Sequence, residues 1–181
     1  MFILASSSPR RKELLKKLLP SFQIEVPNID ESLLDLPPKD LALEEAKAKG
    51  YAIASKHKDD EILACDTIVI FNNKVLGKPH TKEKAIEMLE ELNGKEHIVN
   101  SGYIYIGKGK EITRTVSTKV YFNSLSKEQI IEYVDKFLPL DKAGAYGIQD
   151  DYPLINHIEG SFYNVMGLPI EDIQAHVFNK R

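Results

Sequence analysis

Hydrophobic and polar positions follow a strand period in some segments of the chain and a helical period in others. Short apolar or alternating runs predict strands, and apolar positions three and four residues apart predict helices. The predicted strands span residues 2–5, 22–26, 62–71, 74–76, 97–106 and 112–122. A first predicted helix starts at Pro9, with an apolar face that extends to Leu19. Further predicted helices span residues 40–56, 82–92 and 127–137, and a last helix starts at Pro169. This alternation predicts a mixed α/β fold, and no repeat or linker divides it.

The first predicted helix carries two arginines where a helix least favours them. Pro9 suits the first helical position behind a Ser8 cap, so Arg10 and Arg11 lie in the first turn. There the helix dipole disfavours each cation by about 0.3–1 kcal/mol. Backbone N–H groups, serine hydroxyls, including that of Ser6, and two guanidinium groups together predict a phosphate site. The alternative is a solvated charged turn.

Asp66 places a carboxylate inside the apolar run 62–71, and we expect it to interrupt that strand together with Thr67. Burying a charge without a partner lowers the free energy of unfolding by roughly several kcal/mol. We therefore expect a partner for Asp66: a metal, a cation or a water that it activates. The alternative is an aspartate at a strand end or bulge that binds its own backbone.

Three further side chains carry groups suited to a nucleotide. Lys47 lies beside the small-residue stripe of its helix, from which its ammonium can extend into a cleft, although most helical lysines are only solvated. Lys78 follows a glycine in a constrained loop, where a surface lysine is the default interpretation. Gln149 ends a glycine-punctuated loop, and its carboxamide can donate to and accept from a base edge, although such a glutamine is usually a surface residue.

Composition narrows the class of protein. The chain has 181 residues, of which 43% are hydrophobic and 28% charged, as expected for one globular domain with a substantial core. Its apolar runs fall short of the roughly 20 residues of a membrane-spanning helix, and the N-terminus lacks a signal-peptide pattern, so we expect a cytoplasmic location. The net charge of −3 argues against a nucleic-acid partner. Cys65 is expected in the core, and the histidines show no metal-binding spacing.

Arginines, lysines, carboxylates and hydroxyls on loops together suit phosphoryl transfer, and neither a Walker loop nor a dinucleotide fingerprint occurs. The same residues resemble the Maf nucleoside triphosphate pyrophosphatases, a family named from inhibition of septum formation. The matching segments are 4–11, 30–32, 46–48, 66–67, 77–79, 142–149 and 160–169, in order along nearly the whole chain.

The resemblance implies a mixed central sheet with flanking helices that form two lobes around a cleft, similar to inosine triphosphate pyrophosphatases. It implies one such two-lobed domain over residues 1–181, which is usually a homodimer. The implied reaction is hydrolysis of a nucleoside triphosphate at the α-phosphorus, which gives the monophosphate and pyrophosphate. The implied cofactor is a divalent cation, Mg²⁺ or Mn²⁺.

The resemblance also implies roles for single residues. Asp66 corresponds to the proton acceptor. The phosphate-binding positions are Ser6, Arg10, Lys47 and Lys78, and the base-specificity positions are Arg11, Thr67 and Gln149. An alternative for Asp66 is a metal ligand that shares the ion with Glu31.

The sequence around Gln149 resembles the branch that acts on dTTP and UTP; the 7-methyl-GTP branch has a cysteine before its Ala-Gly. One departure is that Asp150 and Asp151 follow Gln149, where the family typically has glycine. One alternative function is a nucleotide-binding regulator of cell division and septum formation, and another is a pyrophosphatase for a modified nucleotide such as 7-methyl-GTP. Retention of Asp66 with both arginines and both lysines favours catalysis, because a sensor needs no water-activating carboxylate.

Overall fold

The computed structural model describes residues 1–30 and 35–179. Its strands are β1 (Phe2–Leu4), β2 (Gln23–Ile24), β3 (Glu61–Phe71), β4 (Lys74–Leu76), β5 (Glu96–Gly107), β6 (Lys110–Phe122) and β7 (Ile155–Glu159). Its helices are α1 (Pro9–Lys16), α2 (Pro38–Ala54), α3 (Lys82–Leu92), α4 (Lys127–Phe137), α5 (Phe162–Met166) and α6 (Ile170–His176), with a 3₁₀ turn, η2 (Ala143–Ala145). None of these helices is long and apolar enough to cross a membrane.

The strands of the described residues form one seven-stranded mixed sheet in the order β2-β1-β3-β5-β6-β7, with β4 paired to β3. β1 runs parallel to β2 and β3, whereas the pairs β3–β4, β3–β5, β5–β6 and β6–β7 are antiparallel. Asn72 and Asn73, both with positive φ, make the predicted tight turn between β3 and β4. The predicted mixed α/β class is confirmed.

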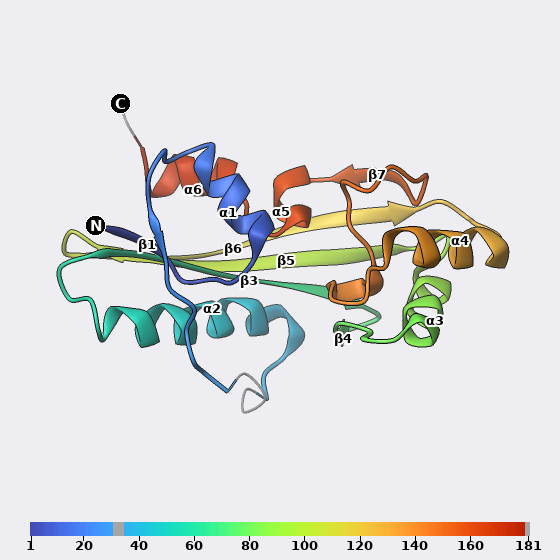
Figure 1. The fold of residues 1–181 in the computed structure, drawn as a ribbon, viewed down its shortest axis with the longest axis horizontal. Coiled ribbons are helices and arrows are strands. Elements are labelled where there is room, and N and C mark those ends of the chain that lie inside the picture. The colour runs from blue at the N-terminus through green and yellow to red at the C-terminus, as the bar shows by residue number, and fades with distance from the viewer. Residues whose placement is uncertain (31–34, 180–181) are drawn as a thin grey trace.

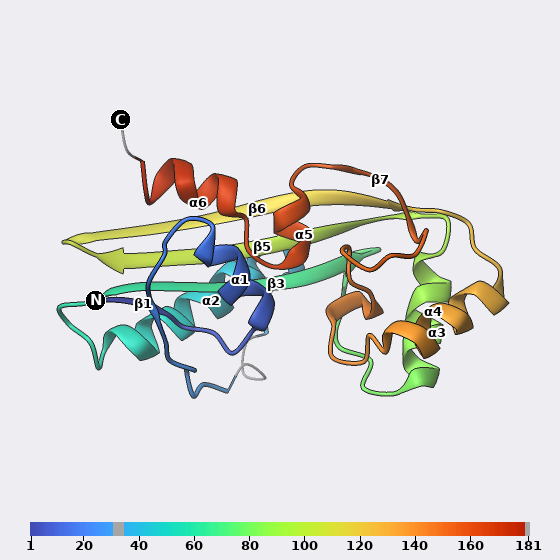
Figure 2. The ribbon, with the colours of Figure 1, turned by 45° about the horizontal axis from the view of Figure 1, so that its top comes forward.

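Helices cover the sheet unevenly (Figures 1 and 2). α1, α5 and α6 lie on one face of the sheet, α2 lies on the opposite face, and α3 and α4 lie together at the end remote from both termini. Two lobes result, each with apolar residues of its own. One lobe packs side chains of α1, α2, α6 and β1 against the sheet, and the other packs α3, α4 and η2 against the far ends of β3, β5 and β6.

Helix α2 approaches the sheet closely because glycine stands where the two meet. A Cβ atom on Gly102 would lie 2.3 Å from the Cα of Leu43 in α2, so any other residue at position 102 of β5 would push the helix away. Gly102 pairs directly with Asp66 of β3. The α2 backbone is therefore held over the strand pair that carries Asp66, and side chains of α2 can reach this carboxylate.

The structure corrects some of the expected boundaries. β3 runs through Asp66 and Thr67 without a break or bulge, because ladder pairing with β5 continues on both sides of Asp66. α2 begins at Pro38 rather than behind an Asp40 cap; proline fits the first helical turn, and Asp40 adds a favourable negative charge to it. The expected strand 22–26 is reduced to Gln23–Ile24.

Two elements were not expected from the sequence. β7 is an edge strand, and its half-exposed residues show no regular alternation of apolar and polar side chains. The segment 160–169, interpreted as a structural corner, contains the five-residue helix α5, capped by Ser161. β7 pairs with β6, and α5 packs against β5 and β6, so both elements depend on tertiary contacts rather than on local pattern.

His97 lies buried in the lobe that carries α3 and α4. Its ring makes edge contacts with Phe122 and Tyr146, and its Nε2 lies 2.6 Å from the Tyr146 hydroxyl. Burial lowers the pKa of His97 from 6.5 to about 4, because the core disfavours the charged imidazolium. The folded protein therefore holds this side chain neutral at pH values where the unfolded chain would protonate it.

This shift predicts acid sensitivity of folding. Stability from His97 is complete above pH 6.5 and is lost as the pH falls toward 4, since the unfolded chain then binds a proton that the folded chain refuses. Between pH 7.5 and pH 5 the loss is about 2 kcal/mol. Urea unfolding of wild type and His97→Gln at both pH values tests this, with exposed His157→Gln as control. His97→Gln should lose about 2 kcal/mol less than wild type and the control over this interval; equal losses would contradict the assignment.

Candidate functional site

A cavity of about 860 Å³ opens between the two lobes. One wall comes from the loop 5–8 and the start of α1, and the opposite wall from the loop 75–80 and the segment 141–149. Its floor is formed by β3 around Asp66 and by the residues before α6. The volume lies within the range of small-molecule and cofactor sites.

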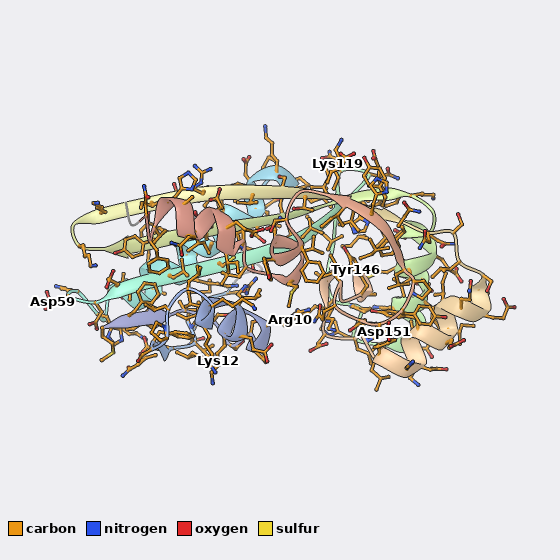
Figure 3. All side chains as sticks on the ribbon, turned by 90° about the horizontal axis from the view of Figure 1, so that it is seen from above. Arg10, Lys12, Asp59, Lys119, Tyr146 and Asp151 are labelled. Carbon is orange, nitrogen blue, oxygen red and sulfur yellow. The ribbon has the colours of Figure 1, made fainter. Side chains whose placement is uncertain are left out.

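The first turn of α1 forms a cationic end of this cavity. Ser8 caps the helix by accepting a hydrogen bond from the backbone N–H of Arg11, as expected, and the buried Ser6 hydroxyl accepts one from the N–H of Ser8. Arg10 lies at the end of α1 that faces the other lobe, which carries Tyr146 (Figure 3).

The pKa of Arg10 is lowered chiefly by burial and then by the charge of Arg11, while Asp141 and Asp150 act in the opposite direction. A half-buried guanidinium beside a second cation, at the positive end of a helix, is electrostatically unfavourable. An anion bound there would offset this unfavourable interaction.

Arg11 and Thr67 were predicted as base-specificity residues, and the structure brings them into contact. The guanidinium of Arg11 donates to the Thr67 hydroxyl at 3.1 Å and to the Gly167 carbonyl at 2.7 Å. The Thr67 hydroxyl also lies 2.7 Å from the Ser101 hydroxyl. These contacts tie α1, β3 and the turn before α6 into one rigid wall of the cavity.

Asp66 forms the acidic centre of the site. Only 9% of its surface is exposed, and Lys49 of α2 donates to its Oδ1 at 2.9 Å. Burial acts to raise the pKa of Asp66, but a hydrogen bond with the Glu45 carboxyl and the charges of Lys49 and Arg11 outweigh it and lower the pKa. Asp66 is therefore ionised at neutral pH.

The two lysines of α2 take different positions. Lys47 pairs with Glu44 at 3.2 Å and is not among the described residues that line the cavity, whereas Lys49 lines it. The sequence placed Lys47 beside the small-residue stripe of α2, from which its ammonium could extend into a cleft, and did not single out Lys49. Glu45 and Lys49 lie one helical turn apart, and this spacing is the signal that could have identified the side of α2 that lines the cavity.

The remaining predicted residues lie on the cavity wall or outside the described chain. Lys78, exposed in the loop after β4, and Gln149, exposed in the segment after η2, both line the cavity. Glu31 lies outside the described residues. Sequence reasoning missed Lys142, which also lines the cavity and is mostly shielded from solvent.

The described residues contain no group of three or more histidine, cysteine or acidic side chains placed to hold a metal. Asp66 and Glu45 nevertheless offer two carboxyl groups, hydrogen-bonded to each other, on the cavity wall. Mg²⁺ commonly binds through one or two carboxylates together with substrate phosphates. The donor set therefore fits a divalent cation that arrives with a phosphorylated ligand.

Comparison with known proteins places the chain in a family. A family model described as "Maf-like protein" matches residues 1–178. The chain belongs to the Maf family. Its segments 4–11, 66–67 and 142–149, which carried the resemblance in the sequence, line the cavity at one or more positions each.

Curated relatives within the Maf family are similar over nearly their full length. A dTTP/UTP pyrophosphatase of Clostridium botulinum (strain 657 / Type Ba4) is 44% identical, over 96% of this chain and 93% of that protein. Proteins of the same name from Carboxydothermus hydrogenoformans and Leptospira interrogans are 44% and 42% identical, over 92% and 94% of this chain and 91% and 90% of theirs. Among solved structures, the Staphylococcus aureus Ham1 protein matches with a TM-score of 0.49 and 14% identity, over 67% of this chain and 71% of that chain.

Proposed function

We propose that this protein hydrolyses dTTP and UTP to the nucleoside monophosphate and pyrophosphate. One observation carries the proposal: a single cavity joins the cationic helix end at Arg10, the Asp66–Lys49 pair and the carboxamide of Gln149. These are the parts that a triphosphate, a reacting phosphorus and a pyrimidine base require. The names of the curated relatives support the same substrates.

In the proposed reaction a water oxygen attacks the α-phosphorus, and the bond from that phosphorus to the α–β bridging oxygen breaks. Pyrophosphate leaves, and the water proton passes to the Asp66 carboxylate. Lys49 and Arg11 keep Asp66 ionised in a buried place, so the carboxylate is ready to orient the water. A divalent cation held by Asp66 and Glu45 would supply charge neutralisation for the phosphate oxygens.

Ser6, Arg10 and Lys78 are proposed to bind the triphosphate, and Lys49 takes the place for which Lys47 was predicted. Arg10 stands at the start of α1, where backbone N–H groups and the dipole both favour a phosphate. Lys78 approaches from the opposite wall. Cations on both sides of the cavity would bring the two lobes together on the triphosphate.

Base choice is assigned to Gln149 with Arg11 and Thr67. A carboxamide can pair with the O4 and N3–H edge of uracil or thymine, as donor to the oxygen and acceptor from the N–H. Cytosine presents an amino group and a bare nitrogen at the same places, so the pairing would have to reverse. A guanine base is larger and presents a different pattern.

A panel of substrates tests this specificity. We expect kcat/KM to be highest for UTP and dTTP among UTP, dTTP, CTP, GTP and 7-methyl-GTP, measured with Mg²⁺ and with Mn²⁺. Gln149→Ala should reduce discrimination against the other bases by about 1–3 kcal/mol. A clear preference for GTP or 7-methyl-GTP would contradict the assigned base pocket.

Arg10→Ala should raise KM for UTP about tenfold or more and lower kcat, because a charge-assisted contact to phosphate is lost. Thermal stability should stay equal or rise slightly, since the free helix loses an electrostatically unfavourable cation. Lys12→Ala is the matched control, because Lys12 is an exposed cation of the same helix (Figure 3). Unchanged kinetics together with marked destabilisation would support the solvated charged turn instead.

We further propose a cytoplasmic location and a homodimer, as the family resemblance implies. The molar mass in solution, measured by light scattering, tests the second. A mass of about twice the chain mass of 20.5 kDa supports the dimer, and a mass equal to that of one chain contradicts it.

A further inference from the structure

The acidic pair after Gln149 consists of two residues in different surroundings. Asp151 is exposed. Asp150 is mostly buried: its Oδ2 accepts a hydrogen bond from the Tyr133 hydroxyl at 2.5 Å, and its Oδ1 lies 3.7 Å from the ammonium of Lys142. Asp150 therefore joins the segment after Gln149 to helix α4 and to the cavity wall.

The same tyrosine also holds the start of this turn. The backbone N–H of Gly147 donates to the Tyr133 hydroxyl at 3.0 Å, and the N–H of Asp150 donates to the Gly147 carbonyl at 3.1 Å. Residues 147–150 thus form a four-residue turn whose two ends are fixed to one buried side chain. Gln149 is the exposed third residue of that turn and faces the cavity.

Tyr133, which holds both ends of this turn, is itself held rigidly by the core. Its side chain is fully buried in the apolar core of its lobe, where its ring packs against Phe137 and Tyr152. A buried hydroxyl that lost its acceptor would leave an unsatisfied donor, so the link to Asp150 resists breaking. The position of the Gln149 backbone is thereby coupled to a rigid core rather than left to an exposed loop.

We propose that Asp150 is a positioning residue for base discrimination: through Tyr133 it fixes the turn that presents Gln149 to the base. This inference rests on the proposed function. Asp150 acts at a distance from the reacting phosphorus, so its loss should alter recognition of the base more than turnover. Misplacement of a recognition group by about 1 Å is enough to cost a large part of its effect.

Charge must be separated from positioning, because Asp150 and Asp141 also act on Arg10 across the cavity. Loss of that negative charge should strengthen binding of every triphosphate alike. The ratio of kcat/KM for UTP to that for CTP cancels this common effect. Asp150→Asn also removes the charge but keeps an oxygen that can accept from Tyr133, whereas Asp150→Ala removes both.

The test measures this ratio in wild type, Asp150→Ala, Asp150→Asn and the control Asp151→Ala. Asp150→Ala should lower the ratio about tenfold, mainly through KM for UTP, with kcat for UTP within about threefold of wild type. Asp150→Asn and Asp151→Ala should keep the ratio within about twofold. A ratio unchanged in Asp150→Ala, or one lowered equally in Asp151→Ala, overturns the proposal.

A second readout does not depend on activity. Amide hydrogen exchange at Gly147 should accelerate about tenfold or more in Asp150→Ala and in Tyr133→Phe, but stay unchanged in Asp151→Ala. Tyr133→Phe removes only the hydroxyl, so it remains informative if Asp150→Ala folds poorly. Unchanged exchange in both variants overturns the positioning role. If exchange is faster in these variants but the wild-type protein shows no preference for UTP over CTP, the turn is held by Asp150 and Tyr133 as described, and the assignment of base recognition to Gln149 is wrong.

Discussion

Asp66→Asn is expected to lower kcat for UTP by about two to four orders of magnitude while the affinity for the nucleotide falls much less. Asparagine keeps the shape of the side chain but can neither accept the water proton nor bind a divalent cation as a carboxylate does. Asp66 is buried, ionised and paired with Lys49, so solvent cannot take over the role of its negative charge. Steady-state kinetics with UTP and the Kd of a non-hydrolysable UTP analogue measure the two effects.

The control for this variant is Asp172→Asn. Like Asp66, Asp172 is a carboxylate that accepts hydrogen bonds from a cationic side chain, in this case Arg114. It belongs to α6 and is not among the described residues that line the cavity. Its substitution should reduce stability and leave kcat within about twofold. Turnover of Asp66→Asn within a few-fold of wild type would remove Asp66 from the reaction.

Lys49→Met is expected to lower kcat about 10²-fold to 10³-fold, an effect of the size found when one preorganised electrostatic contact is removed. Without the ammonium, burial is less well opposed, and the pKa of Asp66 should rise toward its ordinary value or above. The pH at which activity appears on the acidic side should therefore shift upward. A pH profile of kcat/KM from pH 5 to pH 9 measures this shift.

Lys47→Met is the matched control, since it removes the same charge from the same helix two residues earlier. Lys47 pairs with Glu44, so its loss should leave kcat and the pH profile within about twofold of wild type. If Lys47→Met is the more damaging of the two, the lysine assigned to the site is wrong. If both variants are silent, α2 contributes no cation to the reaction.

Local rules predicted the framework of the fold from the sequence. Ser8 and Ser126 are helix caps, and Ser126 forms a reciprocal capping box with Gln129, because a hydroxyl satisfies N–H groups that the helix leaves free. Asn72 and Asn73 form the expected turn, since asparagine tolerates positive φ. These features depend on neighbours in the sequence alone.

Contacts between distant segments could not be predicted in this way. The expectation that Asp66 breaks its strand rested on its poor strand propensity, and the structure instead retains it in β3 opposite Gly102, with Lys49 as a partner from α2. Similarly, the sequence alone does not distinguish the roles of Asp150 and Asp151. Only the hydrogen bond from Tyr133 of α4 to Asp150 does so. Tertiary packing decides such cases, because the compensating group lies far away along the chain.

Hydrolysis of UTP in ¹⁸O-labelled water, with analysis of every product, tests the proposed reaction most directly. Attack of water on the α-phosphorus predicts UMP and pyrophosphate in equal amounts, with the label in the phosphate of UMP and none in pyrophosphate. Label in pyrophosphate would place the attack on the β-phosphorus, and formation of UDP with inorganic phosphate would place it at the γ position. Either result would contradict the reaction assigned to this cavity.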